Sequence, residues 1–118
     1  MVIVEQLERK RTNDSIIITF RLGRTAFENH ILIDDADGND WWFHLADEPS
    51  GHCIVEINDN SKLDKDDIIY ASTLIKEYSK FKNINKKLKV NYLQIKNIKK
   101  GKKRGEAILL TKPNIIFV

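Results

Sequence analysis

The segment Asp40–Cys53, DWWFHLADEPSGHC, constrains the fold more than any other part of the chain. The run Asp40–Leu45 is rich in aromatic residues, and the run His52–Ile57 is rich in β-branched residues. The turn-forming stretch Ala46–Gly51 separates the two runs. Such runs predict two strands of a hairpin. Successive side chains of a strand point to opposite faces, so one face would hold an apolar set: Trp41, Phe43, Leu45, Cys53, Val55 and Ile57. The other face would gather Trp42, His44 and His52.

The rest of the chain predicts further strands and two helices. Strands are expected over Val2–Leu7, Ser15–Leu22, Lys89–Ile98, Glu106–Leu110 and Ile115–Val118. The main helix is expected over Asp66–Ser79, because acidic residues crowd its N-terminus and apolar residues recur with helical spacing. A shorter helix is expected over Thr25–Ile33. We therefore predict an α+β fold, a mostly antiparallel sheet with one main helix, in a single domain spanning residues 1–118.

Composition narrows the class of protein. The 118 residues are 42% hydrophobic, which fits one globular domain with a hydrophobic core. No apolar run approaches the roughly 18 residues of a membrane span, and the first residues do not form a signal peptide. The single cysteine, Cys53, excludes an internal disulfide and fits a reducing compartment. We expect a cytoplasmic protein without a membrane partner.

Charge is distributed unevenly along the chain. Residues 1–75 contain 7 basic and 15 acidic residues, whereas residues 76–118 contain 13 basic and 2 acidic residues. Nine of these basic residues lie between Lys86 and Arg104, and five surround the predicted turn Gly101–Gly105. A lysine-rich turn can contact a phosphate backbone, and an excess of this size attracts polyanions. A merely solvated, lysine-rich surface is the alternative.

The histidine-bearing face admits several interpretations. A zinc site is disfavoured, because His52 and Cys53 are neighbours on a strand and point to opposite faces. A cysteine nucleophile is disfavoured because Cys53 falls on the core face. The loop Asp34–Asn39 resembles part of a calcium loop but lacks the spaced ligands. We expect no metal and no cofactor. Two interpretations stay open: ordinary packing of Trp42 and the histidines, or a surface on which RNA bases stack.

Several short motifs, taken in order, resemble a known family. They are G-R-x-A-x-E-N at Gly23–Asn29, D-x-W-F-H at Asp40–His44, a Pro/Ser/Gly turn followed by histidine at Pro49–His52, and V-x-Y-x-x-I-K-x-I-K-K at Val90–Lys100. Together with the Ala-Ser and Tyr-Ser pairs of the main helix and with Gly105, they make residues 15–118 similar to the NFACT-R domain. This domain is the RNA-binding module of NEMF-like ribosome quality-control factors and of bacterial fibronectin-binding-protein-A-like homologues.

The resemblance implies an RNA-binding domain without catalytic activity, similar to the stand-alone members of the family. Its ligand would be tRNA or ribosomal RNA, in translation or ribosome-associated quality control, with the ribosome or RNA-modifying proteins as possible partners. The expected RNA-binding residues are Arg24, Asn29, Trp42, His44, His52, Lys96, Lys99, Lys100, Lys102, Lys103 and Arg104. Two alternatives remain: a protein-interaction adaptor of a translation or RNA-modification complex, and an RNA nuclease that uses His44 and His52 as acid and base.

Overall fold

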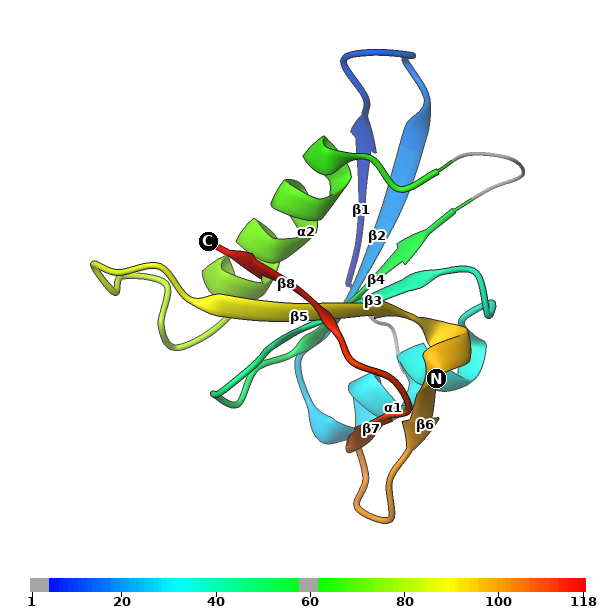
Figure 1. Ribbon diagram of the computed structural model, residues 1–118, viewed down its shortest axis with the longest axis vertical. Coiled ribbons are helices and arrows are strands. Elements are labelled where there is room, and N and C mark those ends of the chain that lie inside the picture. The colour runs from blue at the N-terminus through cyan, green and yellow to red at the C-terminus, as the bar shows by residue number, and fades with distance from the viewer. Residues whose placement is uncertain (1–4, 58–61) are drawn as a thin grey trace.

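Six strands form one antiparallel sheet in the computed structural model, which describes residues 5–57 and 62–118 (Figure 1). The strand order is β1-β2-β4-β3-β5-β8. Their bounds are β1 Glu5–Lys10, β2 Ile17–Gly23, β3 Trp41–Leu45, β4 His52–Glu56, β5 Lys89–Gln94 and β8 Asn114–Phe117. A separate two-stranded sheet consists of β6 Ile98–Lys100 and β7 Ala107–Leu109. With two helices, the predicted α+β class is confirmed.

Both helices begin at capping residues that the sequence supplies. The first helix, α1, spans Ala26–Asp35, and the Thr25 side chain accepts a hydrogen bond from the Glu28 backbone N–H. The second, α2, spans Lys65–Glu77 and starts with a capping box in which Asp64 and Asp67 each accept from the other's backbone N–H. The helices predicted over 25–33 and 66–79 are thus confirmed, with their bounds shifted by one or two residues.

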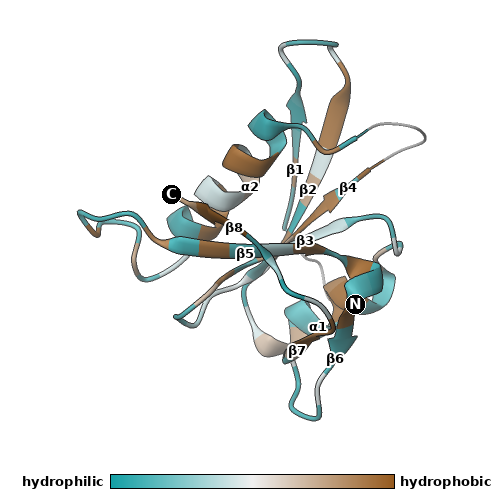
Figure 2. Cartoon of the chain, viewed as in Figure 1, coloured by the Kyte–Doolittle hydropathy of each residue, from teal (hydrophilic) through white to brown (hydrophobic). Residues whose placement is uncertain are grey.

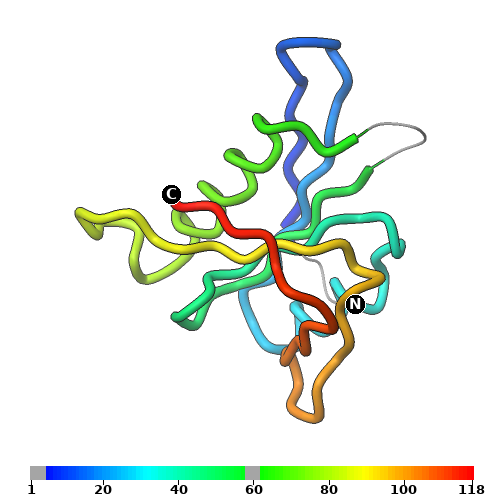
Figure 3. Tube along the Cα trace, in the orientation of Figure 1, coloured from blue at the N-terminus to red at the C-terminus, as the bar shows by residue number. Residues whose placement is uncertain are grey.

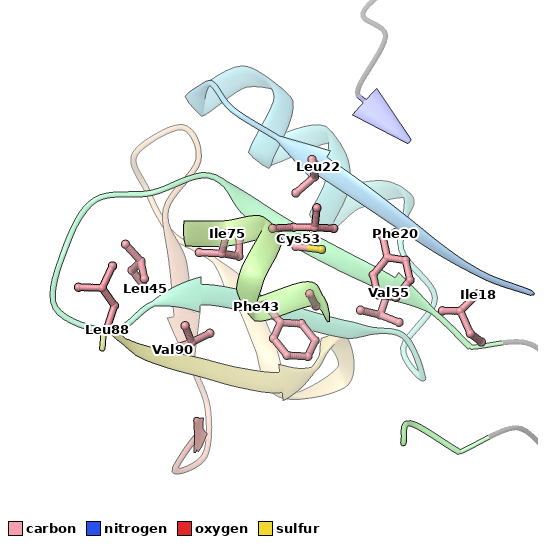
Figure 4. Packing of buried hydrophobic residues seen from close by; sticks show 12 residues of the cluster. Ile18, Phe20, Leu22, Phe43, Leu45, Cys53, Val55, Ile75, Leu88 and Val90 are labelled. Atoms are coloured by element: carbon pink, nitrogen blue, oxygen red, sulfur yellow. The ribbon is translucent and has the colours of Figure 1, made fainter. Parts of the chain in front are cut away.

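The predicted hairpin of β3 and β4 is confirmed in its pairing and in the faces of its side chains. Trp41 pairs with Val55, Trp42 with Ile54 and Phe43 with Cys53. The predicted apolar face packs against α2 in one core (Figure 4). The residues of this core from β3, β4 and α2 that are almost fully buried include Phe43, Leu45, Cys53, Val55, Ala71 and Ile75.

The opposite face of the sheet is also covered, by α1 and by the β6–β7 hairpin (Figure 1). A second core forms there from Leu32, Ile33, Trp42, Ile54, Leu93, Ile95 and Ile98. The outer face expected from the sequence is therefore not open to solvent. Strand alternation assigned the side chains to the correct faces, but it could not show that distant segments would return to cover the second face.

The strand predicted over Lys89–Ile98 is two strands with a break between them. After β5 the chain makes one turn of 3-10 helix, η1 Ile95–Asn97, and then enters β6, and the trace turns away from the sheet at this point (Figure 3). The Ile95 and Lys96 N–H groups donate to the carbonyls of Asp40 and Gly38 at 2.8 and 3.0 Å. At these two residues, hydrogen bonds to the loop before β3 replace the strand pairing of the main sheet. The next strand, β6, therefore belongs to the separate two-stranded sheet.

The first hairpin also differs from its predicted bounds. Residues 1–4 lie outside the described part, so the start of the strand expected at 2–7 is not assessed. The strand β1 continues to Lys10, three residues beyond the predicted end at Leu7 and through the polar residues Glu8–Lys10, because its backbone pairs with β2 from Glu5 opposite Leu22 to Lys10 opposite Ile17. Backbone pairing thus overrides the polar composition of this stretch.

Arg11 follows this strand and joins the first hairpin to the main helix. Arg11 is 4% exposed, and its guanidinium donates to both carboxylate oxygens of the fully buried Asp67, to Oδ2 at 2.6 and 3.0 Å and to Oδ1 at 3.4 Å. It also donates to the Lys62 carbonyl at 2.6 Å. Buried charges of this kind are stable only when they are paired and hydrogen-bonded. The ion pair therefore holds the β1–β2 hairpin against the start of α2.

Candidate nucleic-acid interface

Trp42, His44 and His52 form one contiguous cluster on the α1 side of the sheet. The rings of Trp42 and His44 are stacked, with an interplanar angle of 4° and centroids 5.6 Å apart. The His52 ring stands edge-on to both, at 5.5 Å from Trp42 and 5.0 Å from His44. The predicted grouping of these three side chains is confirmed.

Hydrogen bonds fix the position and the protonation state of His52. The Trp42 indole N–H donates to His52 Nδ1 at 3.1 Å. In a neutral imidazole that accepts at Nδ1, the proton is on Nε2. Burial, followed by the proximity of His44, lowers the pKa of His52 to about 3, and burial lowers the pKa of His44 as well. Both rings are therefore neutral at physiological pH.

Asn29 anchors α1 to this cluster. Its side chain is 7% exposed, and Oδ1 accepts the His52 backbone N–H at 3.1 Å. At this point β2 and β4 approach closely: a Cβ on Gly51 would collide with the carbonyl oxygen of Gly23. The G-R-x-A-x-E-N and Pro/Ser/Gly-His motifs thus meet at a single junction. The asparagine serves to position His52, and its predicted contact with RNA is not favoured by this burial.

Burial also limits what the three rings of the cluster can offer to RNA. Trp42 and His52 are each 3% exposed, whereas His44 is half-buried. The expectation that bases stack on an open surface of Trp42 is wrong, because α1 and the β6–β7 hairpin lie over it. Contact between RNA and this cluster stays a prediction, and it requires access through a pocket.

A pocket of about 320 Å³ does reach the cluster. It lies between β3, β5 and the segment that leads from the β6–β7 turn into β7. Its lining includes Trp42, His44, His52, Asn91 and Gly105. The sequence reasoning missed Asn91, although it is a polar residue within a strand and lies opposite His44 in the register. The pocket could not be foreseen without knowing where β7 returns.

Exposed basic side chains form the tip of the β6–β7 hairpin and directly precede Gly105 of the pocket lining. Lys102, Lys103 and Arg104 are all exposed, and the turn is strongly hydrophilic (Figure 2). Gly105 has a φ of +82°, and a Cβ there would lie 2.8 Å from the Ala26 Cα. The glycine therefore lets the turn pack directly on the start of α1. There the Arg104 guanidinium carbon lies 5.2 Å from the ring centroid of Phe27.

The other lysines that were predicted to contact phosphates differ in their exposure and pairing. Lys100 is held by Asp34 at 2.5 Å and by His30 at 3.2 Å, so its charge is already neutralised. Lys99, the residue before Lys100 in β6, is exposed. Lys96 is also exposed, but it lies in η1 beside the loop at Gly38. The structure thus leaves Lys99 and the tip Lys102–Arg104 exposed, pairs Lys100 with Asp34, and places Lys96 beside the loop at Gly38.

Arg24 lies at the N-terminal end of α1, just after β2. It is half-exposed, its guanidinium carbon lies 6.0 Å from the Tyr78 ring centroid, and Glu5 lies 3.7 Å away. Exposed aromatic side chains next to arginine occur twice in this region, since Phe27 is 43% and Tyr78 is 39% exposed. Such rings are candidate stacking platforms for bases. Neither Phe27 nor Tyr78 is among the RNA-binding residues expected from the sequence.

Cys53 lies at the centre of the core. It is fully buried, and burial raises the pKa of its thiol far above the ordinary value. The predicted core position of Cys53 is confirmed. Within residues 5–57 and 62–118 there is no group of three or more His, Cys, Asp or Glu side chains arranged to hold a metal ion. In the same residues, no helix is long and apolar enough to cross a membrane.

Comparison with known proteins places this chain in a family. A solved structure, the C-terminal part of the fibronectin/fibrinogen-binding protein from Streptococcus suis, superposes with a TM-score of 0.76 at 24% identity. The match covers 94% of this chain but only 44% of that one, so this chain spans less than half of the solved fragment. No protein with a curated description matches. The model of the NFACT protein RNA binding domain matches residues 7–112, and the chain therefore belongs to this RNA-binding family.

Proposed function

We propose that this domain binds structured cytoplasmic RNA, either tRNA or ribosomal RNA, in translation or ribosome-associated quality control. Family membership supports a general role in RNA binding. The single observation that carries the proposed binding mode is the exposed triplet Lys102, Lys103 and Arg104 beside the exposed ring of Phe27. Cations that contact phosphates, next to a ring on which a base can stack, are the usual elements of an RNA-binding surface.

We propose further that the domain binds RNA without cleaving it. General acid–base catalysis at neutral pH needs a group whose pKa lies near the working pH. His52 does not meet this condition, because its pKa is lowered to about 3 and Nδ1 is occupied by the Trp42 indole N–H. A nuclease that uses His44 and His52 is therefore disfavoured. An RNA-cleavage assay of the wild-type protein and of His44→Ala tests this proposal, which would be wrong if the wild type cleaved and the variant did not.

Charge reversal at the tip of the hairpin tests the binding mode. The triple variant Lys102→Glu, Lys103→Glu and Arg104→Glu should weaken binding to tRNA and to ribosomal RNA fragments. Each lost phosphate contact lowers the slope of log K against log salt concentration by about 0.7 for single strands and about 0.9 for duplexes. If all three side chains contact phosphates, the slope should fall by about 2 to 3.

A matched control variant distinguishes binding at the hairpin tip from an effect of the overall net charge. Lys80, Lys82 and Lys112 are also exposed and lie outside the hairpin. Reversing these three changes the net charge by the same amount. We expect this control to retain most of the affinity and nearly the full salt slope. Equal losses in the two triple variants would show that binding follows the overall charge and not the hairpin tip.

A role as a protein-interaction adaptor is a second candidate, because of one edge of the sheet. The strand β8 pairs with β5 on one side only, and it carries Ile115 at 43% and Phe117 at 57% exposure. An apolar edge strand can accept a strand from a partner. Affinity purification with and without nuclease distinguishes the two candidates. Partners that persist after nuclease treatment, but not in Phe117→Lys, would favour the adaptor.

A further inference from the structure

The pocket beside the aromatic–histidine cluster has the dimensions of a site for a single ring system. Its volume of about 320 Å³ lies at the lower limit of small-molecule sites, which span roughly 300–1,000 Å³. Its walls come from β3, β4, β5 and residues 105–109, which are distant in sequence. The exposed basic tip of the hairpin immediately precedes the residues that line it, since Gly105 follows Arg104. The pocket lining is therefore directly connected to the basic tip through the chain.

Two polar atoms at the pocket have no hydrogen-bond partner among the described residues, and one of them is buried. His52 accepts the Trp42 indole N–H at Nδ1, so its Nε2–H is a donor that is available to a ligand. On β5, Oδ1 of Asn91 is buried and unpaired. An unpaired buried polar group costs free energy, and it requires a water or a ligand to satisfy it. One donor and one acceptor at the same pocket match the edge of a nucleobase, where donors and acceptors alternate.

The rings at the pocket provide the apolar contact that a base needs. The stacked pair of Trp42 and His44 forms one wall, and His44 is its more accessible member. Proteins that bind unpaired bases combine contact with aromatic rings and hydrogen bonds to base edges. The pocket contains both elements.

The charge of the pocket argues against a phosphate and in favour of a neutral ligand. Both histidines that line it are neutral at physiological pH, because burial lowers their pKa values. The only other ionisable side chain of the lining is the acidic Glu106. Positive charge is instead concentrated outside, on Lys102, Lys103 and Arg104. A nucleotide would thus be divided between the two regions, with the phosphates on the tip and the base in the pocket.

We propose that this pocket takes up one unpaired nucleobase of the bound RNA, held by Asn91, His52 and the ring of His44. The proposal rests on the RNA-binding function and specifies its ligand. It predicts that the domain prefers RNA with an extrahelical or terminal unpaired base over fully paired RNA. The rest of the affinity comes from the phosphate contacts of the hairpin tip.

Three RNA hairpins of equal length test the proposal. One carries a single bulged nucleotide, the second carries an abasic residue at the same position, and the third is fully paired. We expect the wild-type protein to bind the bulged RNA about 5- to 100-fold more tightly than the abasic RNA, which is the usual range for contacts to one base. Equal affinities for the bulged and abasic RNAs would overturn the proposal. Free nucleosides at millimolar concentration show whether the pocket needs the RNA chain.

A pair of asparagine variants localises the effect. Asn91→Leu removes the polar atoms at nearly constant volume and should abolish the preference for the bulged RNA, while binding to paired RNA is retained. Asn114→Leu is the matched control, because Asn114 lies on the neighbouring strand β8 and lines a different pocket, beside Trp41 and Tyr92. The control should retain the preference. Loss of the preference in Asn114→Leu, with its retention in Asn91→Leu, would place the base elsewhere.

Crosslinking gives a measurement that needs no variant. A 4-thiouridine at the bulged position should crosslink, on irradiation, to a peptide containing residues 41–45 or 105–109. A crosslink confined to Phe27 or Tyr78 would show that the base stacks on the surface instead, and the proposal would fail. If none of the three RNAs bound even at low salt, the RNA-binding function itself would be refuted, which is distinct from binding without base preference.

Discussion

Removing the charge of Asp67 should destabilise the domain more than its single-atom change suggests. Asp67 is fully buried, and it is the main partner of the guanidinium of Arg11, which donates to it at 2.6 and 3.0 Å. The same carboxylate accepts the Asp64 backbone N–H at 3.2 Å and so completes the capping box of α2. Asp67→Asn keeps the volume but leaves a positive charge buried without its closest counter-charge.

The structure sets the expected magnitude. Breaking a buried ion pair by removing one partner typically costs about 3–5 kcal/mol. Arg11 would keep the Lys62 carbonyl at 2.6 Å and two partly exposed carboxylates, Asp14 at 3.2 Å and Asp64 at 3.5 Å. These contacts favour the lower end of the range, about 3 kcal/mol. In a domain of this size such a loss lowers the melting temperature by roughly 10 °C.

Urea unfolding followed by circular dichroism measures the free energy of unfolding directly. Asp14→Asn is the matched control, since it removes a carboxylate from the same Arg11 but at an exposed position, and it should change stability little. The double variant Arg11→Met and Asp67→Leu should recover much of the loss, because no unpaired charge remains buried. The reasoning would be refuted if Asp67→Asn cost less than about 1 kcal/mol, or no more than the control.

Three further predictions concern Asn29 and the first two residues of β4, His52 and Cys53. Asn29→Ala leaves the His52 backbone N–H buried and unpaired, so the free energy of unfolding should fall by about 1–3 kcal/mol in urea titrations. His52 has a pKa of about 3 in the fold against 6.5 when unfolded, so below pH 6.5 the unfolded chain binds the extra proton. Stability should therefore fall by about 2 kcal/mol from pH 7 to pH 5 in the wild type, and less in His52→Gln. The Cys53 thiol should resist labelling in the native protein and react fully in urea; rapid native labelling would contradict its burial.

The local sequence pattern was sufficient to predict the central strands β3 and β4 and the start of the main helix. The alternation in Asp40–Ile57 gave the faces of β3 and β4 correctly, because a strand that is buried on both sides still has a period of two. The acidic residues at 64–67 located the start of the main helix, since capping depends only on neighbours in sequence. Trp42, His44 and His52 were grouped correctly for the same local reason.

Other features depended on contacts between distant residues. The sequence of residues 89–98 gives no sign of the break at Ile95, which depends on carbonyls of Gly38 and Asp40. The pairing of Lys100 with Asp34 joins residues 66 positions apart, so the sequence could not show that this lysine differs from Lys102. The pocket requires β7 to return beside β3. The charge pattern identified the basic turn. Only the fold showed that Lys102–Arg104 at its tip are exposed, whereas Lys100 is paired with Asp34.

The double cover of the sheet has a consequence for how this domain can change over time. Every position along β3 faces one of two packed cores or their edge, so substitutions there are constrained by volume on both sides. The hairpin tip carries no such constraint, because Lys102, Lys103 and Arg104 contribute to neither core. Relatives can therefore alter the charge and length of this turn while the folded scaffold stays the same.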